Sequence, residues 1–68
     1  MNDKVKKLTY SISEAAEALG IGKQRMYELT FVEGFPVLRL GKIKRIPVDQ
    51  LHEWVEAKAK AQEDILQR

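Results

Sequence analysis

The spacing of apolar residues changes along the chain, and each change marks a predicted element. Residues 8–12 alternate apolar and polar side chains, which predicts a short strand or extended segment. A helix is expected over about residues 14–19, with Ser13 as its N-cap and Gly20 as the left-handed residue that ends it. Its buried face would consist of Ala15, Ala16 and Leu19.

A second helix is predicted over about residues 23–32, with Gly22 as a permissive start. Met26 and Leu29 would face inward with Ile21, which would hold the turn between the helices. Two helices joined by a short turn that contains glycine are typical of the helix-turn-helix unit, whose second helix enters the DNA major groove by its N-terminal end. The same pattern also occurs as plain scaffold. The residues left outside are Lys23, Gln24, Arg25, Tyr27 and Glu28.

A hairpin is expected after the second helix, because Pro36 within residues 33–36 breaks the helical pattern. Residues 37–40 and 43–46 are rich in branched apolar side chains, and Gly41 and Lys42 suit a tight turn between two strands. Strand alternation puts Arg39 on the face opposite Leu38 and Leu40. The hairpin lysines, Lys42 and Lys44, are expected to cluster at its tip.

The last predicted helix opens at Pro47 and carries an apolar stripe of Leu51, Trp54 and Val55. The tryptophan is expected to pack under the first helix, and His52 to lie at the surface. The sequence thus predicts an α+β fold, a small winged helix-turn-helix. Three regions are expected: a mobile basic arm (1–8), the winged helix-turn-helix domain (9–56) and an exposed C-terminal helical extension (57–68).

Length and composition narrow the class of protein. A 68-residue chain has one small core and buries only about 60% of the surface that its unfolded form exposes. The chain is 44% hydrophobic and contains no apolar stretch of membrane-spanning length and no signal-peptide pattern. It has no cysteine and a single histidine, so we expect no metal site, no cofactor and no enzymatic activity. These features favour a soluble cytoplasmic protein.

Charge is distributed unevenly along the sequence. Residues 1–48 carry nine basic and five acidic side chains, whereas residues 49–68 carry three basic and five acidic ones. The segment between Glu33 and Asp49 has no acidic residue, and its cations are Arg39, Lys42, Lys44 and Arg45. A basic run of this kind is either a contact surface for a polyanion or a solvated face.

A family resemblance spans about residues 9–56. The motifs that carry it are Tyr-Ser-Ile-Ser-Glu-Ala-Ala-Glu-Ala-Leu-Gly from Tyr10, Met-Tyr-Glu-Leu from Met26, Gly-Phe-Pro-Val-Leu-Arg-Leu-Gly from Gly34, and Arg-Ile-Pro from Arg45. In this order and spacing they resemble the excisionase and AlpA-like group of MerR-related winged-helix DNA-binding domains. Two positions depart from the pattern: Gly22 replaces the usual serine or threonine cap, and Glu28 follows the tyrosine where a basic or neutral residue is common.

The resemblance implies double-stranded DNA as the partner. The recognition helix would present Lys23, Gln24, Arg25, Tyr27 and Glu28 to the major groove, and the wing would present Arg39, Lys42, Lys44 and Arg45 to the backbone and minor groove. Glu28 would either read a cytosine amino group or be turned away from the phosphates. Such a protein would work at the nucleoid of a bacterium or its phages and plasmids.

The resemblance also suggests a biological role. We expect an excisionase or small transcription regulator of a mobile element, with cooperative or dimeric binding to DNA repeats and an integrase as a further partner. Two alternatives remain open: a protein-binding adaptor, in which the basic hairpin is only solvated, and the DNA-recognition domain of a phage small terminase subunit.

Overall fold

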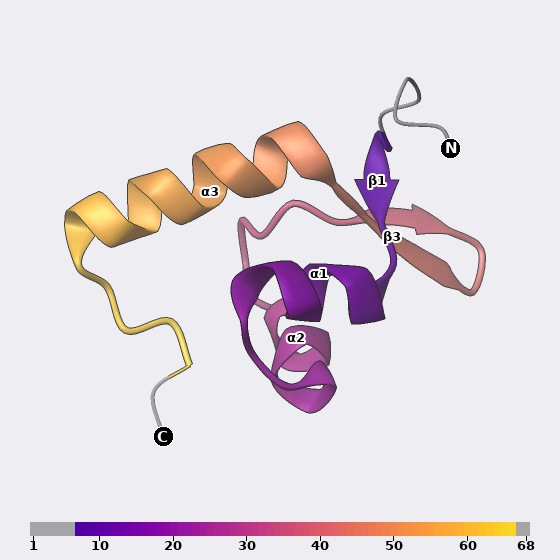
Figure 1. The fold of residues 1–68 in the computed structure, drawn as a ribbon, viewed down its shortest axis with the longest axis horizontal. Coiled ribbons are helices and arrows are strands. Elements are labelled where there is room, and N and C mark those ends of the chain that lie inside the picture. Colours follow the sequence, from indigo (N-terminus) through magenta and orange to yellow (C-terminus); the bar gives the residue numbers. More distant parts are fainter. Residues whose placement is uncertain (1–6, 67–68) are drawn as a thin grey trace.

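The computed structural model describes residues 7–66, which form three helices and a small antiparallel sheet (Figure 1). The sheet has the strand order β1-β3-β2. This architecture confirms the predicted α+β winged helix-turn-helix fold. Most of the predicted N-terminal arm, residues 1–6, lies outside the described residues. The elements are β1 (Thr9–Tyr10), α1 (Ile12–Leu19), α2 (Lys23–Leu29), β2 (Leu38–Leu40), β3 (Ile43–Pro47) and α3 (Val48–Ala61).

Helix α1 begins two residues earlier than predicted, because its N-cap is Ser11 and not Ser13. The Ser11 hydroxyl accepts a hydrogen bond from the Glu14 backbone N–H at 3.1 Å, and the Glu14 carboxylate accepts one from the Ser11 backbone N–H at 2.9 Å. This reciprocal pair is a capping box, which satisfies two backbone donors at once. Ser13 has no acidic or amide residue three positions later, so it could not form one.

The turn between α1 and α2 is fixed by backbone geometry. Gly20 has φ 74°, the left-handed C-cap that was predicted, and the Ile21 backbone N–H donates to the Ala16 carbonyl at 3.0 Å. Gly22 is the N-cap of α2 and makes no side-chain hydrogen bond. Helix α2 is therefore held in place by the packing of its buried face and not by a side-chain cap at its N-terminus.

Helix α2 ends at Leu29, three residues before the predicted end. The Thr30 hydroxyl donates to the Tyr27 carbonyl at 2.6 Å, and the Phe31 backbone N–H donates to the Glu28 carbonyl at 3.1 Å. These shorter-range bonds tighten the last turn and stop the α-helical ladder. The prediction of a helix to residue 32 was wrong. The apolar Val32 continues the helical spacing, but spacing alone does not show which donors bind the last carbonyls of the helix.

Strands β2 and β3 form the predicted hairpin. Gly41 has φ 64° and occupies the first position of the two-residue turn, where a left-handed conformation favours glycine. Arg39 pairs with Lys44, while Leu38 pairs with Arg45 and Leu40 with Ile43. Strand β1 covers the other edge of β3. The hairpin therefore has two unlike faces: Arg39, Lys44 and Ile46 lie on one, and Leu38, Leu40, Ile43 and Arg45 on the other.

The core lies between the helices and β3. Trp54 of α3 packs edge-to-face on Phe35, with ring centroids 4.8 Å apart, so its aromatic partner is in the loop before β2. The Trp54 indole N–H is buried and has no hydrogen-bond partner in the described part of the chain. The fully buried members of the core are Ala15, Ala16, Met26, Leu29, Phe35, Ile46 and Leu51.

The C-terminal segment differs from the predicted helical extension. Helix α3 ends at Ala61, and Gln62 takes a left-handed conformation with φ 55°. The chain then turns back from the end of α3 (Figure 1), where Ile65 and Leu66 pack against the core. The expectation of a helix to the end of the chain was thus wrong for residues 62–66, where partial burial of two apolar side chains favours the turn.

Candidate nucleic-acid interface

The first turn of α2 presents three polar side chains to solvent. Lys23, Gln24 and Arg25 are all exposed, and the first turn of this helix contains no acidic residue. Met26, directly behind them, is fully buried. The packing of Met26 thus fixes the rotation of α2 and points the predicted base-reading side chains away from the core.

Two exposed aromatic rings continue this surface toward the hairpin. Tyr27 is 50% exposed and Phe31 is 61% exposed, and their rings meet edge-to-face with centroids 5.1 Å apart. Tyr27 was predicted as a contact residue, but Phe31 was not. A signal was present, because Phe31 lies four positions after Tyr27 and eight after Lys23, on the same helical ridge.

Lys44 lies against these rings and not at the hairpin tip, so the predicted cluster of lysines at the tip was wrong. Its ammonium is 3.8 Å from the Phe31 ring centroid and 4.5 Å from that of Tyr27, in cation–π geometry. Lys42, in the turn, is exposed at the tip. The register explains the difference, because it places Lys44 on the same face as Arg39 and toward α2.

Thr30 joins the end of α2 to the hairpin, a role that sequence reasoning missed. Its hydroxyl accepts a hydrogen bond from the Lys44 Nζ at 3.2 Å, and its carbonyl accepts one from the Arg39 Nη2 at 3.3 Å. Thr30 is only 2% exposed. One buried residue thus orients two of the predicted wing cations.

Arg45 lies on the other face of the hairpin and braces β1. Its Nε donates to the Thr9 hydroxyl at 3.1 Å, and its Nη2 donates to the Thr9 carbonyl at 3.3 Å. The structure therefore brings Arg39 and Lys44 together beside α2 and separates Arg45 from them. Glu28 is partly buried, unlike its exposed neighbours Arg25 and Tyr27.

The ion pairs of the described residues lie away from this surface. Lys7 Nζ is 2.8 Å from Glu14 Oε2, and Lys58 Nζ is 3.0 Å from Glu63 Oε1. The hydrogen bond from Lys7, followed by the one from the Ser11 backbone N–H, holds the pKa of Glu14 below its ordinary value. Over residues 7–66, no carboxylate comes within salt-bridge distance of the α2 or hairpin cations.

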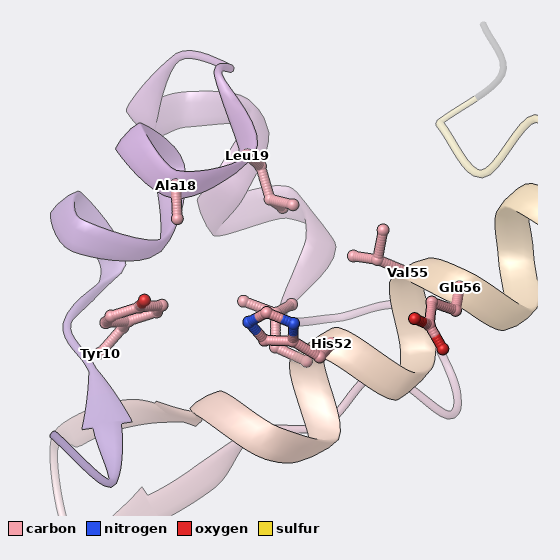
Figure 2. Close-up of a pocket in the computed structure, with 7 residues that line it drawn as sticks. Tyr10, Ala18, Leu19, His52, Val55 and Glu56 are labelled. Carbon is pink, nitrogen blue, oxygen red and sulfur yellow. The ribbon is translucent and has the colours of Figure 1, made fainter. Parts of the chain in front are cut away.

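A small pocket lies between α1 and α3. It has a volume of about 200 Å³ and is mostly apolar. Figure 2 shows His52, Val55 and Glu56 on α3 facing Ala18 and Leu19 of α1, with Tyr10 at one side. No group of three metal-ligating side chains occurs within residues 7–66, and no helix among them has the length and apolarity to cross a membrane.

Comparison with known proteins agrees with this geometry. A family model described as a helix-turn-helix domain matches residues 9–59, which is three quarters of the chain. The match covers α1, the turn, α2, the hairpin and most of α3. No curated protein and no solved structure matches the chain.

Proposed function

The chain belongs to the helix-turn-helix domain family of DNA-binding proteins, and we propose that it recognises specific sites on double-stranded DNA. Helix α2 would enter the major groove by its first turn, and the β2–β3 hairpin would lie on the adjacent backbone and minor groove. The observation that carries this proposal is the attachment of the hairpin to the end of α2 through Thr30. It places the cations of the hairpin beside the exposed ridge of the helix.

The residues would divide into two classes. Lys23, Gln24 and Arg25 can reach base edges, because glutamine pairs with adenine and arginine or lysine with guanine. Arg39, Lys42 and Lys44 would bind phosphates, which position the protein without reading sequence. We assign Arg45 to the brace of β1 rather than to DNA, since its guanidinium donates twice to Thr9. The partial burial of Glu28 favours a docking in which its carboxylate is turned away from the phosphates.

We further propose that the protein acts at a mobile element, as an excisionase or a small transcription regulator. A domain of this size contacts few base pairs, so cooperative binding to repeated sites would supply the specificity that one copy lacks. An integrase encoded beside it would favour the excisionase role. Such a protein would work in the cytoplasm, at the nucleoid.

A protein-binding role is the second candidate, and one observation favours it. The outer face of the hairpin exposes Leu38, Leu40 and Ile43, and exposed apolar clusters often mark protein contacts. This face is opposite the cationic one, so a protein contact there is compatible with DNA binding.

Gel-shift titration against the DNA that flanks its gene, over a range of salt, tests the proposal. Contact with about four to six phosphates predicts a log–log salt slope of roughly −4 to −5. Replacement of Lys42 with alanine should weaken binding to all duplexes, whereas Gln24→Ala should change the preference among them. Lys60→Ala is the matched control, because Lys60 is an exposed lysine of α3 outside the proposed surface. Absence of binding to any duplex at low salt would exclude the proposed function.

A further inference from the structure

We propose that Arg39 and Lys44 form a preorganised site for one backbone phosphate of DNA, and that Thr30 is the positioning residue that builds it. The site lies in the angle between the end of α2 and the hairpin. It rests on the proposed DNA binding, and it adds a defined ligand group, a defined pair of donors and a residue that acts through them.

The Thr30 hydroxyl both donates and accepts a hydrogen bond within the protein. It donates to the Tyr27 carbonyl at 2.6 Å, so its remaining lone pairs are left for the Lys44 ammonium at 3.2 Å. A buried hydroxyl with a fixed donor direction is a fixed acceptor. Since Thr30 is 2% exposed, water competes little for this bond.

Lys44 is further confined by the aromatic rings of Tyr27 and Phe31, at 4.5 and 3.8 Å from its ammonium. A surface lysine ordinarily samples many rotamers, and ordering them on binding costs entropy. Here that ordering is already present in the folded protein. The phosphate would therefore meet an ammonium group whose position is set before DNA binds.

Both cations keep a positive charge that a ligand could contact. Thr30 accepts one of the five N–H donors of the Arg39 guanidinium and one of the three of the Lys44 ammonium, which also lies against the Tyr27 and Phe31 rings. Within residues 7–66, neither cation has a carboxylate in salt-bridge range. Two like charges on directly paired residues repel one another, and a phosphate that accepts from both would relieve this repulsion with charge-assisted hydrogen bonds.

The position of the site gives it a geometric consequence. A phosphate held here would touch the hairpin and the end of α2 together, so it would fix the angle at which the helix enters the groove. Lys42, in contrast, lies at the exposed tip and would hold a separate phosphate. Lys44 would thus fix how the protein is oriented on the DNA, whereas Lys42 would only strengthen binding to any duplex.

A double-mutant cycle on Thr30 and Lys44 tests the site. Thr30→Val keeps the shape and the carbonyl that Arg39 uses, but it removes the acceptor for Lys44. Lys44 would then have to be ordered when DNA binds, so DNA binding should be several-fold and at most about tenfold weaker. In a Lys44→Gln background, Thr30→Val should have no further effect on affinity, because Thr30 acts through Lys44. Thr30→Ser is the matched control and should bind like the parent protein.

Ethylation interference gives a readout that a general structural role would not move. At one phosphate per bound copy, ethylation should no longer interfere with the binding of Thr30→Val or Lys44→Gln, but it should still interfere with Thr30→Ser, and all other interfering positions should be retained. Equal interference patterns for the parent and Lys44→Gln, or additive losses in the cycle, would overturn the site while DNA binding stands. If Thr30→Val unfolds in a melting experiment, Lys44→Gln and Thr30→Ser still decide the phosphate assignment. Failure of the parent protein itself to bind DNA would instead remove the proposed function.

Discussion

The two helices of the helix-turn-helix unit have nearly equal lengths but are held in opposite ways. Helix α1, of eight residues, carries a capping box at Ser11 and a left-handed glycine at its end. Helix α2, of seven residues, begins at Gly22 without a side-chain cap and ends at a buried threonine bound to the hairpin. Local sequence defines α1, whereas tertiary contacts define α2.

This difference suits the work proposed for each helix. Isolated helices of this length are marginal in water, so α2 owes its order to the burial of Met26 and Leu29 and to the hairpin. Its first turn has no side-chain cap, and Lys23, Gln24 and Arg25 are exposed there, so these positions can carry the residues proposed to contact DNA. Helix α1 is the scaffold against which α2 is set.

Removing the core contact of α2 should have the largest effect. Met26 is fully buried, and Met26→Ala should cost about 2–5 kcal/mol, from lost burial and the cavity left behind. A core this small seldom provides more than about 3–5 kcal/mol in total, so the variant should be largely unfolded in urea titrations followed by circular dichroism. Arg25→Ala, on the exposed face, should change stability by less than about 0.5 kcal/mol. Equal losses would show that α2 is not held by its buried face.

Removing the cap of α1 should have an intermediate effect. Ser11→Ala removes the acceptor for the Glu14 backbone N–H and should lower the free energy of unfolding by about 1 kcal/mol. Ser13→Ala is the matched control, since Ser13 is exposed inside the first turn of the helix. Chemical denaturation gives the free energy of unfolding of both variants. A larger decrease for Ser13→Ala than for Ser11→Ala would contradict the assignment of Ser11 as the cap.

The capping box should also make stability depend on pH. The folded state lowers the pKa of Glu14 below its ordinary value of 4.5, mainly through Lys7 and the Ser11 backbone N–H. The stabilisation is therefore present at neutral pH and is lost as the pH falls from about this value through the folded-state pKa. Glu14→Gln should melt below the parent protein at pH 7, and the gap should close as the pH falls below the lowered folded-state pKa of Glu14. A gap that stays constant with pH would show that the carboxylate charge contributes nothing.

Supplying α2 with a cap should have the smallest effect. A Cβ at Gly22 would meet no atom within 4 Å, and the glycine has φ −73°, which any residue adopts. Gly22→Ser should therefore raise the free energy of unfolding by a few tenths of a kcal/mol, measured by thermal melting. A destabilised Gly22→Ser variant would mean that this position is closed to a side chain.

The sequence predicted elements well where the signal was local. Gly20 and Gly41 take left-handed backbone conformations that few residue types adopt, and each ended or turned an element as expected. The choice of Ser13 over Ser11 ignored a local signal, the glutamate three residues after Ser11. Alternation correctly assigned Arg39 to the strand face opposite Leu38 and Leu40.

What the sequence did not reveal depends on tertiary docking. Thr30 accepts hydrogen bonds from the hairpin only when the hairpin folds over the end of α2. The sequence of residues 27–33 does not indicate that two cations will bind there. The burial of Ile65 and Leu66 likewise depends on a turn at Gln62, which is neither glycine nor asparagine and gives no local sign of a left-handed residue. The exposure of Lys23, Gln24 and Arg25 could be predicted from the sequence, but Phe31 and the hydrogen-bond partners of Arg39 and Lys44 could not.

An NMR titration with a short duplex at low salt tests most directly whether α2 and the hairpin form the DNA surface. Amide shifts should change over residues 22–31 and 39–44, while the exposed face of α3, including Glu53 and Lys60, should stay unperturbed. Strong shifts around the pocket of Tyr10 and His52, or along α3, with none on α2, would contradict the proposed interface.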